Sequence, residues 1–360
     1  MKLLPNLTGL RFVLAFLVVI FHIPQFCQNR GFPYYNNLSI FNKGEEAVYM
    51  FFSLSGFLII RQLYIEKSVS SSVNLKKFFL RRIVRIFPLY YLVLTFGLVY
   101  YRFILPLLGF DYENNYDLVY GIFLSYTFFP NIFASFSPGG IIEVLWSIGI
   151  EEQFYLLIAP LIFIIPLKKI IQFLLIFTVF FFIIYFSESI KFLRNYNMLF
   201  FYFSFSGLCS IMSLNKRMHF YNLNYMFFFL IIIYFITPIF RNIFTDFYYH
   251  LTSMILFGLT LYNLSEKPIK LLENKWLIYL GKISFGVYMY HAIIMQLVGF
   301  IFLKSNLHSK ISNLNSIIIF NLLVFVLTII IAHLSFKYFE SYFLSLKEKL
   351  IWNRKPKNFL

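Results

Sequence analysis

The sequence predicts an all-α fold: a polytopic integral membrane bundle of about ten transmembrane helices with one re-entrant segment. Of its 360 residues, 60% are hydrophobic and only 13% are charged, whereas a soluble domain usually carries about 25% charged residues. The hydrophobic residues gather in long blocks, for example 170–186, 225–240 and 317–332. Blocks close to the ~17–25 residues that cross a bilayer predict transmembrane helices.

The apolar blocks, taken in chain order, predict ten spans. Their approximate bounds are 8–26, 46–61, 84–105, 142–166, 169–187, 197–213, 222–240, 249–264, 282–303 and 315–336. The first span contains Arg11 and His22 and is followed by no small-residue cleavage site, so we expect a retained helix rather than a signal peptide. The spans leave no room for a soluble domain of useful size. We therefore expect one integral membrane domain over 1–340 and a basic cytoplasmic tail over 341–360.

The distribution of basic residues predicts the orientation. The net charge is +16, and if Met1 is cytoplasmic, 23 of the 31 lysines and arginines lie on the cytoplasmic side. This bias follows the positive-inside rule and predicts that both termini are cytoplasmic. The same charges would contact anionic lipid head groups. Nucleic-acid binding is not expected, because no basic domain exists to carry it.

The segment 118–133 is apolar but does not fit the ten spans. Pro130 interrupts it, and Pro138 and the pair Gly139–Gly140 follow it. A complete crossing would invert the charge bias of every later loop, so we expect a re-entrant or outer-leaflet segment. Irregular backbone is tolerated at this depth only where protein or water satisfies its polar groups. The segment is therefore predicted to form a wall of a cavity.

Ionisable residues inside spans are informative because an uncompensated charge in a bilayer costs several kcal/mol. Arg11 and His22 are separated by about 16 Å along one helix and share nearly one face. They could line one path through the membrane. A structural explanation also fits: an orienting arginine at a helix entrance and a histidine held by a neighbouring helix.

The spacing i, i+4, i+8 places Ser147, Glu151 and Tyr155 in one polar stripe of the fourth span. Trp146 precedes the stripe near the outer interface, where tryptophan commonly anchors. Glu151 could serve only to tie helices together. However, serine or asparagine could do that at lower cost, so the stripe favours a functional role.

Five basic residues lie between 76 and 85, at the predicted cytoplasmic entry to the third span. Orientation of the helix and lipid contact would explain most of them. Arg82 and Arg85, however, lie three residues apart on one face, and the planar guanidinium suits a phosphate group. They indicate a binding site for an anionic cofactor that enters from the cytoplasm. By contrast, Cys27 and Cys209 suggest neither a disulfide framework nor a metal site, and no metal is expected.

Five segments in order together resemble the membrane-bound acyltransferase-3 family, which includes bacterial O-antigen and exopolysaccharide acetylases. They are 7–11 followed by His22 (Arg-x10-His), 51–59, 79–90 (Arg-x-x-Arg), 146–155 (Trp-Ser-x3-Glu-x2-Phe-Tyr) and 281–291 (Ser-x3-Tyr-x2-His). The chain departs from the family pattern at Thr8, where an aspartate is frequent. It departs again after Glu340, where the family's Glu-x-Pro is Glu-Ser-Tyr.

The resemblance implies transfer of an acyl group, acetyl by default and succinyl as an alternative, from acyl-CoA at the bacterial inner membrane. The acceptor would be a hydroxyl of a cell-envelope polysaccharide or lipid-linked sugar. The implied site comprises His22 and Glu151 as catalytic residues, Arg11, Arg82 and Arg85 for the CoA phosphates, and Trp146, Ser147, Tyr155 and His291 for the substrate. His22 would act as a general base or carry the acyl group transiently.

A carrier or flippase for lipid-linked sugars is the alternative from a different functional class. Its transport path would also be lined by polar groups inside the membrane. It predicts inverted repeats and paired broken helices, and the sequence shows neither. An acyltransferase is therefore favoured.

Overall fold

The computed structural model describes residues 4–110, 116–214 and 224–352, and throughout these ranges the regular structure is helical. The elements are α1 (Leu7–Asn29), η1 (Ser39–Asn42), α2 (Gly44–Ser70), α3 (Leu75–Val99), η2 (Tyr100–Ile104), α4 (Leu105–Leu107), α5 (Leu118–Tyr126), α6 (Pro130–Phe133), η3 (Ala134–Phe136), α7 (Gly140–Glu143), α8 (Trp146–Ile164), η4 (Leu167–Lys169), α9 (Ile170–Tyr185), α10 (Phe192–Asn195), α11 (Phe200–Leu214), α12 (Asn224–Ile236), α13 (Ile239–Ile243), α14 (Asp246–Glu266), α15 (Lys275–Lys282), α16 (Ser284–Ser305), α17 (Leu307–Lys310), α18 (Asn313–Ser335), η6 (Phe336–Glu340) and α19 (Ser341–Trp352). The prediction of an all-α membrane bundle is confirmed.

Seven helical stretches in the described ranges are long and apolar enough to cross a membrane. They are α1, α2, α3 with η2 and α4, α7 with α8, η4 with α9, α16, and α18 continuing into α19. Each coincides with one of the ten predicted spans. The remaining three predictions, 197–213, 222–240 and 249–264, correspond to α11, α12 and α14.

These three helices fall short for identifiable reasons. Within the described residues, helix α11 has 15 residues and α12 has 13, and each of these lengths is shorter than the ~30 Å of a bilayer core at ~1.5 Å per residue. Helix α14 has 21 residues but is not among the sufficiently apolar helices. The predicted spans also included residues that the structure places in turns. Asn197, the first residue of the predicted span 197–213, has a φ of 53° and lies in the turn before α11. The total of ten spans therefore stays a prediction.

The stretch between the second and third predicted spans, 61–85, is largely helical. Helix α2 continues to Ser70 and α3 begins at Leu75, with Ser71 in the left-handed conformation at the turn. The Asn74 side chain caps α3 by accepting a hydrogen bond from the Lys77 amide at 2.8 Å. The predicted basic cluster consequently lies on α3, and a rigid helix determines where Arg82 and Arg85 point.

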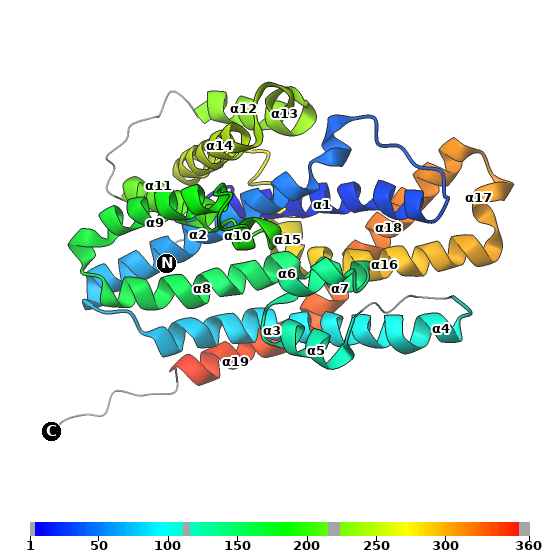
Figure 1. Ribbon diagram of the computed structural model, residues 1–360, viewed down its shortest axis with the longest axis horizontal. Coiled ribbons are helices and arrows are strands. Elements are labelled where there is room, and N and C mark those ends of the chain that lie inside the picture. The colour runs from blue at the N-terminus through cyan, green and yellow to red at the C-terminus, as the bar shows by residue number, and fades with distance from the viewer. Residues whose placement is uncertain (1–3, 111–115, 215–223, 353–360) are drawn as a thin grey trace.

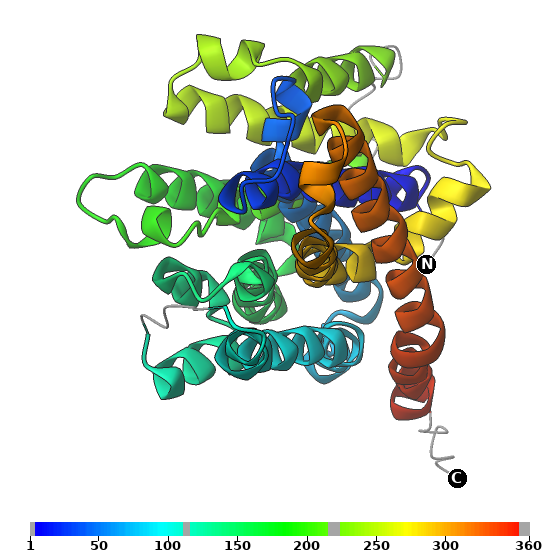
Figure 2. The same ribbon diagram turned by 90° about the vertical axis from the view of Figure 1, so that its right-hand side faces the viewer.

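Helix α1 lies at the centre of the bundle and packs against α2, α15 and α16. Figure 2 shows α1 and α16 near the middle, with α12–α14 on one edge and α3 and α5 on the opposite edge. The crossing of α1 with α15 requires glycine: a Cβ added at Gly9 would lie 2.2 Å from the Leu272 carbonyl oxygen, and one at Gly281 would lie 1.9 Å from that of Thr8. This close approach holds the start of α1, and with it Arg11, in place.

The interrupted segment 118–133 forms the short helices α5 and α6 rather than a continuous helix. Phe128 has a φ of 63° and breaks the segment between them. Side chains of the bundle satisfy its backbone: Tyr90 donates to the Ser125 carbonyl at 2.7 Å, and Gln153 donates to that of Phe128 at 2.7 Å. This arrangement agrees with the predicted irregular segment packed against the bundle.

The basic turns gather at one end of the molecule. Figure 1 shows the turns between α2 and α3 and between α8 and α9 at the same end as α19, whereas α4 and α17 lie at the other end. Assignment of the basic end to the cytoplasm stays a prediction. The first part of the predicted tail forms α19, which packs against α3, and its last part, 353–360, lies outside the described residues.

Candidate active site

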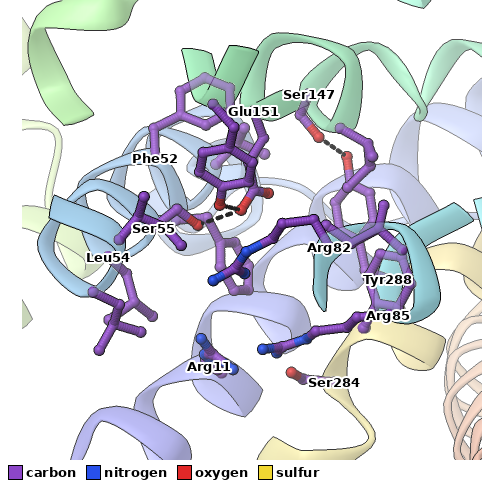
Figure 3. Close-up of a pocket in the computed structure, with 18 of the residues that line it drawn as sticks. Arg11, Phe52, Leu54, Ser55, Arg82, Arg85, Ser147, Glu151, Ser284 and Tyr288 are labelled. Carbon is purple, nitrogen blue, oxygen red and sulfur yellow. Dashed lines mark hydrogen bonds between the residues drawn. The ribbon is translucent and has the colours of Figure 1, made fainter. Parts of the chain in front are cut away.

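A cavity of about 300 Å³ lies between α1, α2, α3, α8 and α16. We call it the arginine cavity, because Arg11 of α1 and Arg82 and Arg85 of α3 line it together with Glu151 and Tyr155 of α8. Figure 3 shows the three guanidinium groups pointing into the same space, although they come from two helices. The structure thus brings together all three arginines that the sequence analysis assigned to a phosphate site.

The charges of the arginine cavity are not balanced. Among the described residues, no carboxylate forms an ion pair with Arg11, Arg82 or Arg85. Arg82 lies 5.3 Å from the centre of the Tyr155 ring, and its Nε atom is buried without a hydrogen-bond partner. Glu151 accepts hydrogen bonds from Ser55 Oγ at 2.6 Å and from the Tyr155 hydroxyl. The excess of positive charge inside the bundle suits an anionic ligand.

A second cavity, of about 730 Å³, adjoins the first. We call it the histidine cavity: His22 and Gln25 of α1, Trp146 of α8 and Glu143 of α7 line it, as does Asn131 from the predicted re-entrant segment. The prediction that this segment forms the wall of a cavity is confirmed. The walls combine carboxylates, amides and an indole ring, a set that can hydrogen-bond a polar ligand and pack against it.

Tyr288 and Val48 line both cavities and lie where the two meet. The Tyr288 hydroxyl donates to the Val144 carbonyl at 2.7 Å and lies 2.7 Å from Ser147 Oγ. These bonds hold the tyrosine ring between α8 and α16. Tyr288 is therefore the polar group that lies between the two cavities.

His22 and His291 form a stacked pair at the histidine cavity, with ring centres 5.3 Å apart and planes inclined by 28°. His291 is fully buried, and its Nδ1 faces the Tyr288 carbonyl. A ring nitrogen that faces a carbonyl must carry the proton, so Nε2 of His291 is the unprotonated nitrogen. That Nε2 atom is buried without a hydrogen-bond partner. His22 is half-buried and lines the cavity, and it has Gln25 as a side-chain partner.

Apart from His291, which is buried and lines neither cavity, the predicted site residues divide between the two cavities. Ser147, Glu151 and Tyr155, the predicted stripe, all line the arginine cavity. Arg11 and His22 share α1 but open into different cavities, joined at Tyr288. Glu151 and His22 line different cavities, and the Glu151 carboxylate is hydrogen-bonded to Ser55 and Tyr155. A catalytic role for Glu151 stays a prediction.

Several residues of the site were not singled out from the sequence. Tyr288 and Ser55 lie inside the segments 281–291 and 51–59 that resemble the family. A hydroxyl within such a segment was the feature that could have identified them. Arg61 of α2 also lines the arginine cavity and donates to the Ser210 carbonyl at 3.1 Å. Glu340, whose role the missing proline put in question, is buried in η6 and accepts a hydrogen bond from Ser335 Oγ at 3.2 Å. Its carboxylate also interacts electrostatically with Arg85.

The two cysteines, Cys27 and Cys209, are buried as free thiols. Within the described ranges, no group of three or more histidine, cysteine, aspartate or glutamate side chains is arranged to hold a metal ion.

Several known proteins are similar to this chain. Peptidoglycan O-acetyltransferase OatA of Listeria monocytogenes is 29% identical over 168 residues, which are 43% of this chain and 24% of that protein. A putative acetyltransferase, ORF330 of Acidianus two-tailed virus, is 36% identical over 125 residues, 35% of this chain and 32% of that protein. O-acetyltransferase OatA of Staphylococcus aureus is 29% identical over 164 residues, 43% of this chain and 24% of that protein. No solved structure matches the chain.

The matched part of the chain thus spans between a quarter and a third of the length of these relatives. The comparison with family models covers far more of this chain. The acyltransferase-3 family model, described as an acyltransferase domain, matches residues 4–335, which include all the arginines and histidines of the two cavities. The chain therefore belongs to the acyltransferase-3 family.

Proposed function

We propose that the protein is a membrane O-acetyltransferase that transfers an acetyl group from acetyl-CoA to a hydroxyl of a cell-envelope polysaccharide. The observation that carries the proposal is that the arginine cavity, with its excess positive charge, lies next to the histidine cavity, which contains His22. The relatives named as O-acetyltransferases, two of which carry the name OatA, support acetyl as the acyl group and a glycan as the acceptor.

The arginine cavity is the proposed donor site. Its volume of about 300 Å³ is at the lower end of the ~300–1,000 Å³ usual for ligand pockets. It would therefore hold the phosphate-bearing part of acetyl-CoA rather than the entire nucleotide. Charge-assisted hydrogen bonds from Arg11, Arg82 and Arg85 would compensate the phosphates. Because acetyl-CoA is a cytoplasmic metabolite, this proposal also places the basic end of the bundle in the cytoplasm.

The histidine cavity is the proposed acceptor site, with His22 as the general base. His22 would remove the proton from the acceptor hydroxyl while the oxygen attacks the thioester carbonyl. The carbon–sulfur bond then breaks, and the CoA thiolate leaves and takes up the proton from His22. His291 supports this role by geometry, because its ring stacks on the His22 ring with centres 5.3 Å apart and so restricts the orientation of the imidazole.

A transient acyl-His22 is also compatible with the site. Donor and acceptor would enter through separate cavities that meet at Tyr288, so the acetyl group would cross from one side to the other on the imidazole. In this route the histidine nitrogen displaces CoA first, and the acceptor hydroxyl displaces the histidine afterwards. Rapid-quench detection of a labelled protein before acceptor is added distinguishes the two routes.

An assay with purified protein in lipid nanodiscs tests the proposed function. Acetyl-CoA labelled in the acetyl group is supplied with envelope glycan, and free CoA and labelled glycan are both measured. The expected result is CoA release that depends on the glycan and equals the acetyl groups transferred. Movement of lipid-linked sugar without CoA release would instead support the carrier that the sequence analysis kept as the alternative.

A further inference from the structure

A third cavity, of about 780 Å³, lies beside the histidine cavity. We call it the side cavity. Its walls come from the segment between α1 and α2, the first turn of α2, α13 and the start of α14, and they include Asn37, Asn42, Asn242 and Asp246. Helices α1 and α2 contribute to both the side cavity and the arginine cavity, but the two cavities share no lining residue. The side cavity is therefore separate from the proposed donor site.

The side cavity and the histidine cavity are neighbours with a common wall. Phe21, Glu45 and Asn197 line both of them. Phe21 directly precedes His22, so the shared wall lies next to the proposed base. Each cavity alone falls within the ~300–1,000 Å³ range of a complete ligand pocket. Together they offer space for a ligand larger than the single group that reacts at His22.

The side cavity has balanced charge. Three basic and three acidic side chains line it: Lys43, Arg194, Arg241, Glu45, Glu46 and Asp246. Arg194 and Arg241 each contact Asp246 at 3.1 Å, and Lys43 contacts Glu46 at 3.2 Å. With its cations already paired, the cavity offers an anion little attraction. A neutral polar ligand is the better match.

The uncharged groups of the wall indicate what kind of neutral ligand fits. Four asparagines, Asn37, Asn42, Asn197 and Asn242, line the cavity. Each amide can both donate and accept hydrogen bonds, as the hydroxyls of a sugar can. Tyr49, Tyr185 and Tyr249 add aromatic surface against which the apolar face of a sugar ring can pack. The combination suits a neutral saccharide.

The wall is held rigid by a buried network. Lys43 donates to the Tyr249 hydroxyl at 3.0 Å, and Tyr249 donates to Glu46 at 2.6 Å. Tyr234 extends the network by donating to Tyr249 at 2.9 Å. A preorganised wall loses less entropy when a ligand binds. The network therefore favours a binding site over a gap between loosely packed helices.

We propose that the side cavity binds a second sugar unit of the acceptor, so that the enzyme acts on an oligosaccharide chain rather than on a free monosaccharide. The unit to be acetylated lies at His22, and its neighbour lies against the asparagines of the side cavity. This inference rests on the proposed function.

The test compares acceptors of different length. Envelope glycan from the organism that encodes the chain is hydrolysed completely to monosaccharides, or partially to oligosaccharides of three to eight units. Transfer from acetyl-CoA to both pools is measured for the native protein in nanodiscs. The expected kcat/KM is about tenfold higher for the oligosaccharides, the gain expected from two additional neutral hydrogen bonds.

Two variants locate that preference in the side cavity. Asn37→Ala combined with Asn242→Ala removes amides from two walls, and both residues are exposed to the cavity and outside the ion pairs. Ser39→Trp fills the same space. Each is expected to reduce the oligosaccharide preference to within about twofold. Asn313→Ala combined with Asn315→Ala removes two exposed asparagines that line none of the three cavities, and this matched control should keep the preference.

The outcomes separate this inference from the proposed function. If native protein acetylates both pools equally well, or if the two variants keep the tenfold preference, the side cavity is not an acceptor site, although the enzyme remains an acetyltransferase. If neither pool is acetylated, the proposed function itself fails and this inference fails with it.

Discussion

The arginine cavity and the side cavity both contain buried charge, but only the side cavity compensates it internally. In the side cavity, Lys43 and Glu46 form an ion pair at 3.2 Å with a tyrosine hydroxyl shared between them. In the arginine cavity, Arg82 and Arg85 have no ion-pair partner among the described residues, and Glu151 is bound to hydroxyls instead. The paired charges of the side cavity form part of its wall. The excess positive charge of the arginine cavity would instead be compensated by a bound anion.

This difference has an energetic basis. Removing one partner of a buried ion pair is strongly destabilising, because it leaves the other charge without compensation. Within the described residues, the arginines of the arginine cavity already lack a paired counter-charge in the native protein. The protein tolerates this cost in the arginine cavity, which is reasonable if an anionic substrate relieves it. We therefore expect different effects of substitution in the arginine cavity, in the side cavity and at His22 of the histidine cavity.

The largest expected effect is at His22, which connects the donor side to the acceptor side. His22→Gln keeps a hydrogen-bonding side chain but cannot accept the proton during attack. Loss of a general base typically lowers the rate by a factor of ~10²–10⁴. We expect the variant to insert normally, to bind acetyl-CoA with native affinity, and to lose nearly all glycan acetylation, measured as labelled acetyl on the glycan.

The matched control is His333→Gln. His333 also lies within a membrane-spanning stretch and is bound to the Tyr279 hydroxyl, but it lines none of the three cavities. Its substitution should leave acetylation within about threefold of native protein. If His22→Gln retained activity at that level as well, His22 would be a packing residue.

The next effect concerns stability and has opposite signs in the two cavities. Glu46→Gln leaves Lys43 buried beside the Tyr234 ring without a counter-charge, so we expect a loss of about 3 kcal/mol in the free energy of unfolding. Thermal unfolding in detergent would show this as a lower Tm. The exposed pair Glu188–Lys191 provides the control, because Glu188→Gln should cost less than about 1 kcal/mol.

The arginine cavity supplies the contrasting result. Arg85→Gln removes one of several mutually repelling cations, so ligand-free protein should keep its Tm or gain slightly. A fall in Tm as large as that of Glu46→Gln would mean that Arg85 is part of the structural framework, and the contrast between the two cavities would be lost.

The sequence predicted contacts between residues that are close in the chain, but not contacts between residues that are far apart in it. Arg82 with Arg85, and Ser147 with Glu151 and Tyr155, were correctly placed on common faces because helical periodicity determines spacing within one helix. The Lys43–Tyr249 contact joins residues 206 positions apart, and no local pattern specifies it. The side cavity is built almost entirely from such contacts, which is why it was not predicted.

The errors of the sequence analysis have the same origin. Helix boundaries depend on individual turns, such as those at Ser71 and Asn197, whose positive φ angles hydropathy does not report. As a result, the predicted spans at 46–61 and 84–105 do not mark the ends of α2 and α3, which continue to Ser70 and begin at Leu75. The pairing of Arg11 with His22 was correct for their helix but incomplete, because Tyr288 from α16 divides the path between them.

A third prediction concerns donor affinity. Arg82→Ala combined with Arg85→Ala removes charge-assisted contacts to phosphate, worth ~1.5–3 kcal/mol each, so acetyl-CoA should bind at least about tenfold more weakly. Binding is measured by isothermal titration in nanodiscs. Lysine at both positions should restore affinity only in part, because it lacks the planar fork. Lys168→Ala with Lys169→Ala removes equal charge from η4, outside the arginine cavity, and unchanged binding there shows that position matters.

The smallest expected effect is the response to salt, and it tests both cavities in one experiment. Ions screen charge–charge attraction, although less within a protein than at its surface. Between 50 and 500 mM potassium chloride we expect the KM for acetyl-CoA to rise about threefold. The KM for a neutral oligosaccharide should stay constant, because the side cavity pairs its own charges. Acetyl-pantetheine, which lacks the nucleotide phosphates, is the control donor, and its KM should not respond to salt. Equal salt sensitivity of both donors would show that the arginines do not bind phosphate, and their excess charge would then need another explanation.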